Sequence, residues 1–529
     1  MPSTTIASLL LLAAVLVPAC TSDRAHTPPP VGPEPIPPPV EVAPALAPVE
    51  LEVLGELAND YLRADAATEV MARIRIRSPE SEDGQRPRAA IGLVVDTSAS
   101  MEGEAIAQAR GAAVTLLDGL RDGDVLSVVT FGSASQVVVP NTVLGPDTRP
   151  QIRTAIEAMA ATGTTDLAGG LRASLAQLQR QARVGEINRM VLVSDGVPND
   201  PSPLASLAQQ ARGAGISITT LGLGLEYHET LLGQLAQASG GTFHFVEDPA
   251  EVAAVFRDEV LSIDRLAARG VSLTLTPGPG VQIVAVSGHA GSTQGSNLVV
   301  GLPDMVEGET QQVIIRLAVG EHYDGATVEL LDGVVGYADA RTNTVIQRRT
   351  FLSARATDDD EQRAQGVDLD VAVAAARATT AAATLEIMAM ARRGQVEAAT
   401  AKLDATVEDA RALSERVSDA ALAKLIDDLV ELRPTLPGLA PVPVAKAPRS
   451  AQPRARDAKG KQSAVVRATG AHGEIGLGGS SGAVMAGSTG AVPRPEPAPL
   501  SEGAARGVRA SHERAYKTLH GSRPRRRGR

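Results

Sequence analysis

The sequence predicts an α/β protein in which a doubly wound parallel-sheet domain is inserted in a small β-sandwich, followed by a helical hairpin or bundle and a disordered basic tail. Three observations lead to this fold class. Between residues 89 and 263, short apolar strands alternate with amphipathic helices, which is typical of a parallel sheet covered on both faces. Strands of alternating polarity flank this inserted domain on both sides. Beyond residue 359 the apolar spacing becomes helical, and beyond residue 434 no period remains.

The composition limits the architecture and the chemistry. A chain of 529 residues has room for two to four domains. The net charge is −11, yet residues 451–529 hold 15 Lys and Arg against 5 Asp and Glu, so the rest of the chain is strongly acidic. Trp is absent and aromatic residues are scarce, so the cores must be built from Ala, Val, Leu and Ile. The single cysteine, Cys20, excludes an intrachain disulfide and a cysteine metal cluster.

Residues 1–20 are predicted to be a lipoprotein signal peptide. Residues 6–17 form an apolar run too short to span a bilayer, and the sequence V-P-A-C that follows resembles a bacterial lipobox, in which Cys20 is lipidated. Residues 1–9 depart from this pattern because they lack Lys and Arg, and the alternative is an uncleaved apolar tail with a chance cysteine. Neither Thr21 nor Ser22 is the aspartate that resembles an inner-membrane retention signal. We therefore expect an extracytoplasmic protein anchored to a bacterial membrane, with the outer membrane favoured.

The next segments are predicted to be a tether and part of a sandwich. Residues 21–49 are rich in proline, which favours an extended polyproline II tether rising about 3.1 Å per residue. Residues 69–77 alternate as a half-buried strand. Similar strands follow the inserted domain, so residues 50–88 plus 264–353 are expected to form a split β-sandwich. The alternative is two unrelated clusters of strands.

The inserted domain, residues 89–263, shows its elements in order. Strands are expected at residues 91–95, 125–131, 190–194, 216–223 and 242–246. Helices are expected over residues 106–120, around 152–159 after Pro150, and at 167–181, 231–238 and 252–263. The strand at 91–95 ends abruptly in Asp96, which begins the sequence D-T-S-A-S and places oxygen atoms at Asp96, Ser98 and Ser100. These side chains stand at the carboxyl end of a buried strand, where open α/β sheets bind their ligands.

This pattern resembles the metal-ion-dependent adhesion site of von Willebrand factor type A domains. The sequence G-T-T-D-L at residues 163–167 resembles the family loop that supplies a metal-binding threonine, here Thr165, and V-L-V-S-D-G at 191–196 resembles the strand that ends in a second aspartate, Asp195. The resemblance covers residues 89–262. It implies that Ser98, Ser100 and Thr165 ligate a cation directly, while Asp96 and Asp195 hold coordinated waters or bind directly. Mg²⁺ is the expected cofactor, with Mn²⁺ or Ca²⁺ as alternatives.

The resemblance implies metal-bridged protein binding, in which an Asp or Glu carboxylate of a partner completes the coordination, and it implies no catalytic residue. Four alternatives stand beside it: the polar residues cap the next helix, the site keeps its ligands without binding a partner, the protein is a non-adhesive envelope scaffold, or it is a metal-dependent hydrolase. The sequence lacks a Walker phosphate loop, a zinc-protease helix and a G-x-S-x-G elbow, which argues against an enzyme. The two histidines of the domain, His228 and His244, are interpreted as structural, and Asn199-Asp200 as a solvated turn with a partner surface as the alternative.

The C-terminal third is predicted to be helical and then disordered. Helices are expected at residues 371–393, 395–413 and 420–432 within a helical region at 359–433, ended by Pro434 and Pro437. Residues 434–529 are expected to be a disordered, basic tail that ends in R-P-R-R-R-G-R. For an exported lipoprotein, anionic envelope components or its own acidic body are favoured partners of this tail over nucleic acid.

Overall fold

The computed structural model of the chain describes residues 47–80, 86–181, 186–223, 229–246, 251–289, 291–440 and 500–520. The predicted lipidation site Cys20 and nearly all of the proline-rich tether lie outside these residues. So do His228 and the basic cluster at 523–529.

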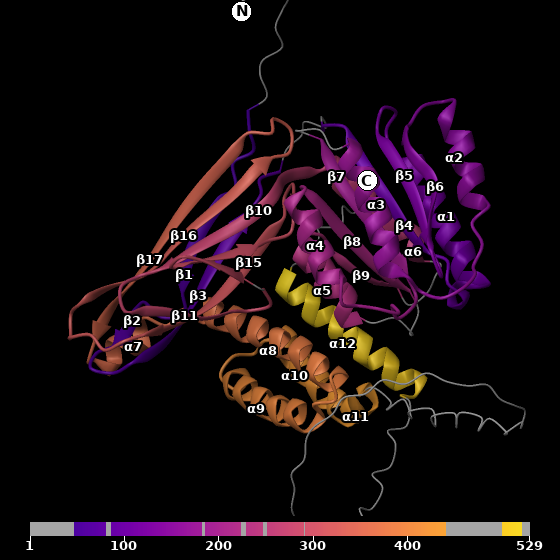
Figure 1. The fold of residues 1–529 in the computed structure, drawn as a ribbon. Helices are drawn as coiled ribbons and strands as arrows, with labels where there is room; N and C mark the ends of the chain where they lie inside the picture. Colours follow the sequence, from indigo (N-terminus) through magenta and orange to yellow (C-terminus); the bar gives the residue numbers. More distant parts are fainter. Residues whose placement is uncertain are drawn as a thin grey trace, which may run out of the picture. The chain divides into compact units, whose positions relative to one another are not determined.

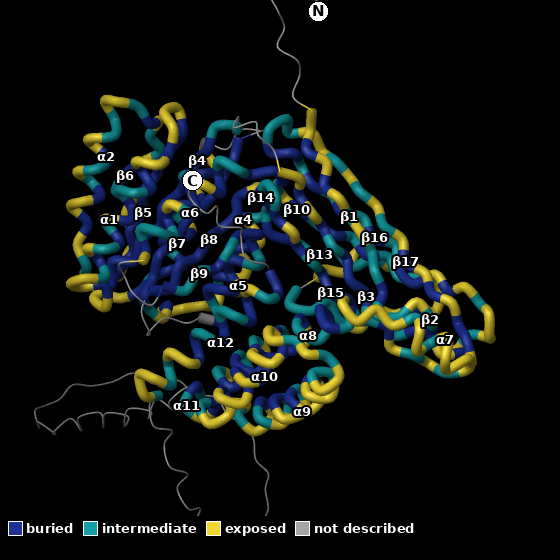
Figure 2. Tube along the Cα trace, turned by 180° about the vertical axis from the view of Figure 1, so that it is seen from behind, coloured by how far each residue is buried: buried dark blue, intermediate teal, exposed yellow. Residues whose placement is uncertain are grey.

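The inserted domain is built on one sheet with the strand order β6-β5-β4-β7-β8-β9 (Figure 1). Its strands are β4 (Ala89–Asp96), β5 (Val125–Phe131), β6 (Ser135–Val143), β7 (Ile187–Ser194), β8 (Ile216–Leu223) and β9 (Phe243–Val246). All but β6 run parallel, and every residue of β4, β5, β7 and β8 is buried, which explains their continuous apolar runs (Figure 2). The antiparallel edge strand β6 was not predicted, because most of its residues are exposed and its sequence lacks a buried run.

Helices cover both faces of this sheet, as the sequence predicts. They are α1 (Glu104–Gly119), α2 (Thr148–Glu157), α3 (Leu167–Gln181), α4 (Leu204–Gly213), α5 (Glu229–Ser239) and α6 (Val252–Asp264). One apolar core lies between the sheet and α1, α2 and α6, and a second core lies between the sheet and α3, α4 and α5. Helix α4 was not predicted, although Leu204, Leu207, Ala208 and Ala211 are spaced for one helical face and are all buried.

Strands from before and after the inserted domain pair with each other. One sheet has the order β1-β3-β15-β11, formed by β1 (Glu52–Leu57), β3 (Thr68–Arg77), β15 (Thr310–Val319) and β11 (Val281–Val286). The other has the order β12-β13-β10-β16-β17-β2, and β14 also pairs with β10. Its strands are β12 (Gly291–Gln294), β13 (Asn297–Gly301), β10 (Leu266–Pro277), β16 (Thr327–Asp339), β17 (Val345–Thr357), β2 (Tyr61–Arg63) and β14 (Met305–Val306). Ile74 of β3 lies opposite Val313 of β15, and one apolar core joins the two sheets. The polypeptide therefore leaves this sandwich to form the inserted domain and then returns to it.

A bundle of helices follows the sandwich. The short helix α7 (Asp360–Gln365) lies against β2 and β17 (Figure 1). The bundle itself consists of α8 (Leu369–Arg392), α9 (Val396–Ser414), α10 (Ala420–Leu432) and α11 (Leu436–Leu439), with a 3₁₀ turn at Arg433–Thr435. Helices α8 and α10 begin where the carboxylates of Asp368 and Asp419 accept backbone N–H groups. By length and composition α8 could cross a membrane, but 61% of its most apolar window is buried inside the structure. Pro434 and Pro437 stand in the first turns of short helical segments, where proline is tolerated, so the helical region continues beyond its predicted end.

The prediction that residues 434–529 are disordered is wrong for the helix α12 (Glu502–His520). Its buried positions Val508, Ala515, Tyr516 and Leu519 share one face. The apolar pattern of this face is weak in the sequence because Arg, Gly and Ser residues stand among these positions. The helix packs against α8 and α10 of the bundle and against α5 and β9 of the inserted domain (Figure 1). Arg514 also forms a two-pronged ion pair with the buried Asp428 of α10, at 2.5 and 2.6 Å. Tertiary packing stabilises this helix, and local sequence propensity does not reveal it.

Tyr516 is predicted to be the main anchor of α12 on the inserted domain. Its ring is 4% exposed and meets Phe243 of β9 edge-on, with 5.5 Å between ring centroids. Replacing Tyr516 by Ala should accelerate amide exchange in α12 by at least about tenfold, because a buried aromatic contact is lost. Hydrogen–deuterium exchange with mass spectrometry measures this. Lys517→Ala, on an exposed position of the same turn, is the control and should leave exchange unchanged.

Candidate metal centre

The turn after β4 gathers the first three predicted ligands. Asp96 is the last residue of the central strand, and its Oδ1 accepts the Ser98 backbone N–H at 2.8 Å. A 3₁₀ turn, Ala99–Met101, follows and brings Ser100 Oγ to 3.0 Å from Ser98 Oγ. Asp96 is 0% exposed and Ser98 is 2% exposed. The local hydrogen bonds therefore hold one carboxylate and two hydroxyls together at the carboxyl end of the sheet.

The neighbouring strand β7 supplies the second carboxylate. Strands β4 and β7 run parallel with Val95 opposite Val193, so both end at the same level of the sheet. Ser100 Oγ donates a hydrogen bond to Asp195 Oδ1 at 2.8 Å, and Ser194 Oγ donates to Asp96 Oδ2 at 2.6 Å. Each aspartate thus accepts a hydrogen bond from a serine that lies close to the other aspartate in the sequence, one in the turn after β4 and one at the end of β7. Ser194 was not predicted as a site residue, although it directly precedes Asp195 in the motif.

The third loop brings Thr165 to the same place. A methyl group at Gly196 would stand 3.2 Å from Thr165 Oγ1 and 3.6 Å from Asp96 Oδ2, so both oxygens border Gly196. The Ala99 backbone N–H donates to the carbonyl of Gly163 at 3.0 Å, which ties this loop to the turn after β4. All five residues predicted from the sequence therefore lie in one cluster.

Asn199 braces the loop that carries Thr165. Its backbone N–H donates to the Thr165 carbonyl at 3.1 Å, and its side-chain amide donates to Thr164 Oγ1 at 3.1 Å. The sequence interpretation of a simple solvated turn missed this role, since the contact joins loops distant in sequence. His244 lies 3.2 Å from the carboxylate of the buried Glu259, away from the cluster, in a structural setting.

The donor chemistry fits a hard cation. Burial raises the pKa of Asp96, and hydrogen bonds from Ser194 and Ser98 only partly oppose this rise. Among the described residues, no Lys or Arg forms an ion pair with Asp96, so its negative charge is buried without a cation. Within the same described ranges, no group of three or more His, Cys, Asp or Glu side chains could hold a metal. The cluster offers two carboxylates and three hydroxyls, an all-oxygen donor set that would suit Mg²⁺ or Mn²⁺ better than softer metals.

Comparison with known proteins identifies the inserted domain. The family model described as the von Willebrand factor type A domain matches residues 90–258. These residues form a von Willebrand factor type A (VWA) domain. Such domains in general mediate protein–protein interactions and commonly bind a divalent metal ion.

Two bacterial relatives of unassigned function share part of the chain. The uncharacterized protein YfbK of Escherichia coli (strain K12) is 24% identical over 196 residues, which cover 36% of this chain and 34% of YfbK. The uncharacterized protein sll0103 of Synechocystis is 25% identical over 241 residues, which cover 45% of this chain and 56% of that protein. The chain therefore spans between a third and somewhat over half of the length of these relatives.

A solved structure extends the likeness beyond the VWA domain. The von Willebrand factor type A protein from Catenulispora acidiphila superposes with a TM-score of 0.59 at 19% identity, over 73% of this chain and 90% of that chain. Because the VWA match occupies only about a third of the chain, this superposition also includes elements outside that domain. At this identity the likeness concerns the fold alone.

Proposed function

We propose that the VWA domain binds an acidic side chain of a protein partner through a divalent cation, Mg²⁺ or Mn²⁺. Asp96, Ser98, Ser100, Thr165 and Asp195 would hold this cation. The observation that carries the proposal is the convergence of these five oxygen-bearing side chains from three separate loops, linked by the hydrogen bonds from Ser100 to Asp195 and from Ser194 to Asp96.

The composition of the donor set supports a carboxylate partner over a self-sufficient structural site. Only two of the five side chains, Asp96 and Asp195, are carboxylates, and three are neutral hydroxyls. These two carboxylates only neutralise a divalent cation, and five side-chain oxygens leave a sixth position of an octahedral ion open to an oxygen ligand from outside the domain. The protein's own residues position the ligands in advance, since Asp96 and Ser98 are already hydrogen-bonded and buried.

The surface beside the cluster supports a partner of extended shape. A polar hollow of about 520 Å³ adjoins the turn after β4 and is lined by Thr97, Ser133, Gln136 and Thr162, among others. Thr97 lies between two of the proposed ligands in the sequence, so the hollow lies beside the turn that carries them. Residues flanking the partner's carboxylate would enter this hollow and add hydrogen bonds to hydroxyl and amide groups.

We further propose that Cys20 anchors the protein by a lipid to a bacterial membrane on the extracytoplasmic side, with the outer membrane favoured and the protein facing the periplasm or the cell surface. The lipobox-like sequence V-P-A-C supports this location. A metal-dependent binding domain held outside the cytoplasm by a proline-rich tether would reach partners in the envelope. Metabolic labelling with a fatty-acid analogue, lost in Cys20→Ser, tests the anchor separately from the metal centre.

Replacing Thr165 by Ala should weaken Mg²⁺ binding by about tenfold or more, because one neutral ligand is removed from the cluster. Thr164→Ala is the matched control, since Thr164 belongs to the same loop but hydrogen-bonds Ser133 and Asn199 instead. Isothermal titration of Mg²⁺ into each protein measures the difference. Equal affinities for the two variants would show that Thr165 is not a ligand.

The same pair of variants tests partner binding. Cross-linked capture from intact cells should recover a protein with the wild-type chain and Thr164→Ala in Mg²⁺, and lose it with EDTA or with Thr165→Ala. Substituting the Asp and Glu residues of the recovered protein should then identify one carboxylate on which capture depends. Capture that survives both EDTA and Thr165→Ala would contradict the metal-bridged interaction.

A further inference from the structure

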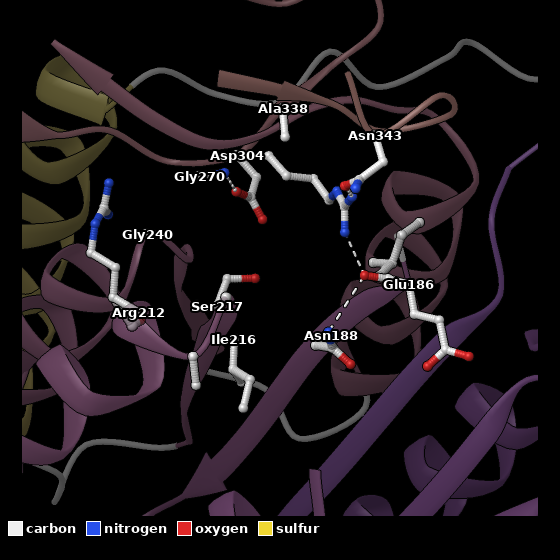
Figure 3. Close-up of a pocket in the computed structure, with 15 residues that line it drawn as sticks. Glu186, Asn188, Arg212, Ile216, Ser217, Gly240, Gly270, Asp304, Ala338 and Asn343 are labelled. Atoms are coloured by element: carbon white, nitrogen blue, oxygen red, sulfur yellow. Dashed lines mark hydrogen bonds between the residues drawn. The ribbon is translucent and has the colours of Figure 1, made fainter. Parts of the chain in front are cut away.

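A second cavity lies at the opposite end of the VWA sheet from the metal cluster. It encloses about 280 Å³ where β7 and β8 begin and where α4 ends, against residues of β10 and the loops of the sandwich (Figure 3). Strand β7 starts at Ile187 beside this cavity and ends at Ser194 beside the metal cluster. Eight residues of strand separate the two places by about 25 Å, so the cavity is a distinct site.

Two arginines line this cavity without a carboxylate partner. Arg212 donates to the carbonyl of Val271 at 2.8 Å, and Arg269 donates to the Glu186 carbonyl and the Asn343 side-chain oxygen, each at 2.5 Å. Among the described residues, neither guanidinium lies within ion-pairing distance of a carboxylate. Burial lowers the pKa of both arginines, and the charge of Asp304 offsets this only in part. Both guanidinium groups are part-buried, and these hydrogen bonds go to neutral oxygens rather than to carboxylates.

The negative charges at the cavity are already engaged elsewhere. Asp304 accepts the Gly270 backbone N–H at 2.9 Å and lies 3.7 Å from the guanidinium of Arg189, which also pairs with Glu259. The Glu186 carboxylate lies 3.6 Å from Arg88. The lining therefore carries two arginines and two carboxylates, and each carboxylate also contacts a group other than Arg212 and Arg269.

Hydrogen-bonding groups in the cavity are left unsatisfied. Ser217 Oγ, Arg269 Nε and Asn188 Oδ1 are buried and have no hydrogen-bond partner in the described part of the chain. Ser217 is 5% exposed and Asn188 is 8% exposed, and both line the cavity. In Figure 3, Ser217 and Asp304 face the space between them. Buried polar atoms without partners are rare in folded proteins, and three of those in the described residues belong to side chains that line this cavity.

We propose that this cavity binds a small oxyanion of the phosphate type. The guanidinium groups of Arg212 and Arg269 and the hydroxyl of Ser217 would donate to its oxygens, and Asn188 Oδ1 would accept from the hydroxyl of a hydrogen phosphate. A cavity of about 280 Å³ holds orthophosphate, or a phosphomonoester with a short organic group. Because Arg212 comes from α4 and Arg269 from β10, the bound anion would link the VWA domain to the sandwich.

Titration calorimetry of the full chain tests the proposal. Inorganic phosphate and glycerol 3-phosphate are titrated separately, each in a chloride buffer of constant ionic strength that contains EDTA. We expect a Kd below about 1 mM for at least one of the two, and a rise in Tm with that ligand. Tighter binding of phosphate assigns the site to the free anion, and tighter binding of glycerol 3-phosphate assigns it to a phosphomonoester.

Ser217→Ala should weaken binding of the anion at least about threefold, because it removes one donor and leaves the fold intact. Arg269→Gln should weaken it at least about tenfold. Arg77→Gln, an exposed arginine of β3 outside the cavity, should bind as the wild type does. If Arg269→Gln fails to fold, the comparison of Ser217→Ala with the wild type tests the proposal by itself. No binding of either ligand up to about 10 mM, or equal binding by Ser217→Ala and wild type, would overturn the proposal.

Discussion

Replacing Asp96 by Asn is expected to lower the affinity for Mg²⁺ by at least about 100-fold. Asp96 is fully buried at the centre of the cluster and carries one of its two negative charges. Asparagine has nearly the same shape and can still accept the Ser98 backbone N–H, so the turn after β4 should persist. Isothermal titration with Mg²⁺ and with Mn²⁺ measures the loss.

Asp96→Asn should be more stable to heat than the wild type without a metal ion, and less stable than the wild type in Mg²⁺. In EDTA, Asp96→Asn should unfold at a higher temperature than wild type, because it no longer buries a carboxylate without a cation. In saturating Mg²⁺ the wild type should become the more stable protein, since only it gains binding free energy, about 2.7 kcal/mol at a hundredfold excess over Kd. Asp200→Asn makes the same chemical change in an exposed loop nearby and should alter neither property. A wild-type Tm that does not respond to Mg²⁺ would contradict metal binding at this cluster.

Replacing Arg86 by Met is expected to destabilise the VWA domain by about 3–5 kcal/mol. The Arg86 side chain is 2% exposed, donates to both carboxylate oxygens of Asp124 at 2.8 and 2.7 Å, and donates to Asp264 at 2.5 Å. Arg86 thereby connects the residues before β4, the turn before β5 and the end of α6. Without Arg86, the charge of Asp124 stays buried with only backbone donors from Ala89 and Arg121. Urea unfolding monitored by circular dichroism measures the change in midpoint.

A matched control and a pH series separate this effect from general loss of packing. Arg121 pairs with the same Asp264 at 3.2 Å, but its side chain is 43% exposed, so Arg121→Met should cost less than about 1 kcal/mol. Burial alone would raise the pKa of Asp124, but its bonds to Arg86 and the backbone bring the pKa below its ordinary value. This carboxylate therefore stabilises the wild type above pH about 4, and that contribution is lost as the pH falls through its native pKa.

In Arg86→Met, burial dominates and the native pKa of Asp124 should rise above its unfolded value. Protonation then relieves the buried charge, so the variant should become more stable relative to wild type as the pH falls toward 4. A stability difference that stays constant from neutral pH to pH about 4 would contradict the electrostatic explanation.

The convergence of the five oxygen-bearing side chains could be predicted from the sequence because each belongs to a short motif at the end of a strand or the start of a helix. Asp96 and Asp195 end buried strands, and buried parallel strands are readable as apolar runs. Thr165 lies two residues before a helix, α3, whose bounds were also predicted. Since parallel strands that are neighbours end at the same edge of a sheet, three such motifs must meet there. Ser194 and Asn199 escaped prediction because their partners are distant in sequence.

The elements that could not be predicted from the sequence depend on contacts between segments that are distant in the chain. Strand β6 lies at a sheet edge with exposed side chains, so it shows no apolar run, and its place is decided by pairing with β5. Helix α12 has a narrow apolar face that is buried only when α5, α8, α10 and β9 surround it. The arginine cavity is lined by side chains from α4, β8 and β10, among others, so no local sequence motif predicts it.

The sequence by itself determined the α/β sheet of the VWA domain, its metal-ligand motifs and the return of the chain to a β-sandwich, because periodicity and strand-end motifs are local properties. Only the tertiary structure decided that α12 joins the bundle to the VWA domain and that two unpaired arginines share a cavity. Those features depend on burial and charge balance among segments far apart in the chain. Burial of that kind exists only once the segments have packed together.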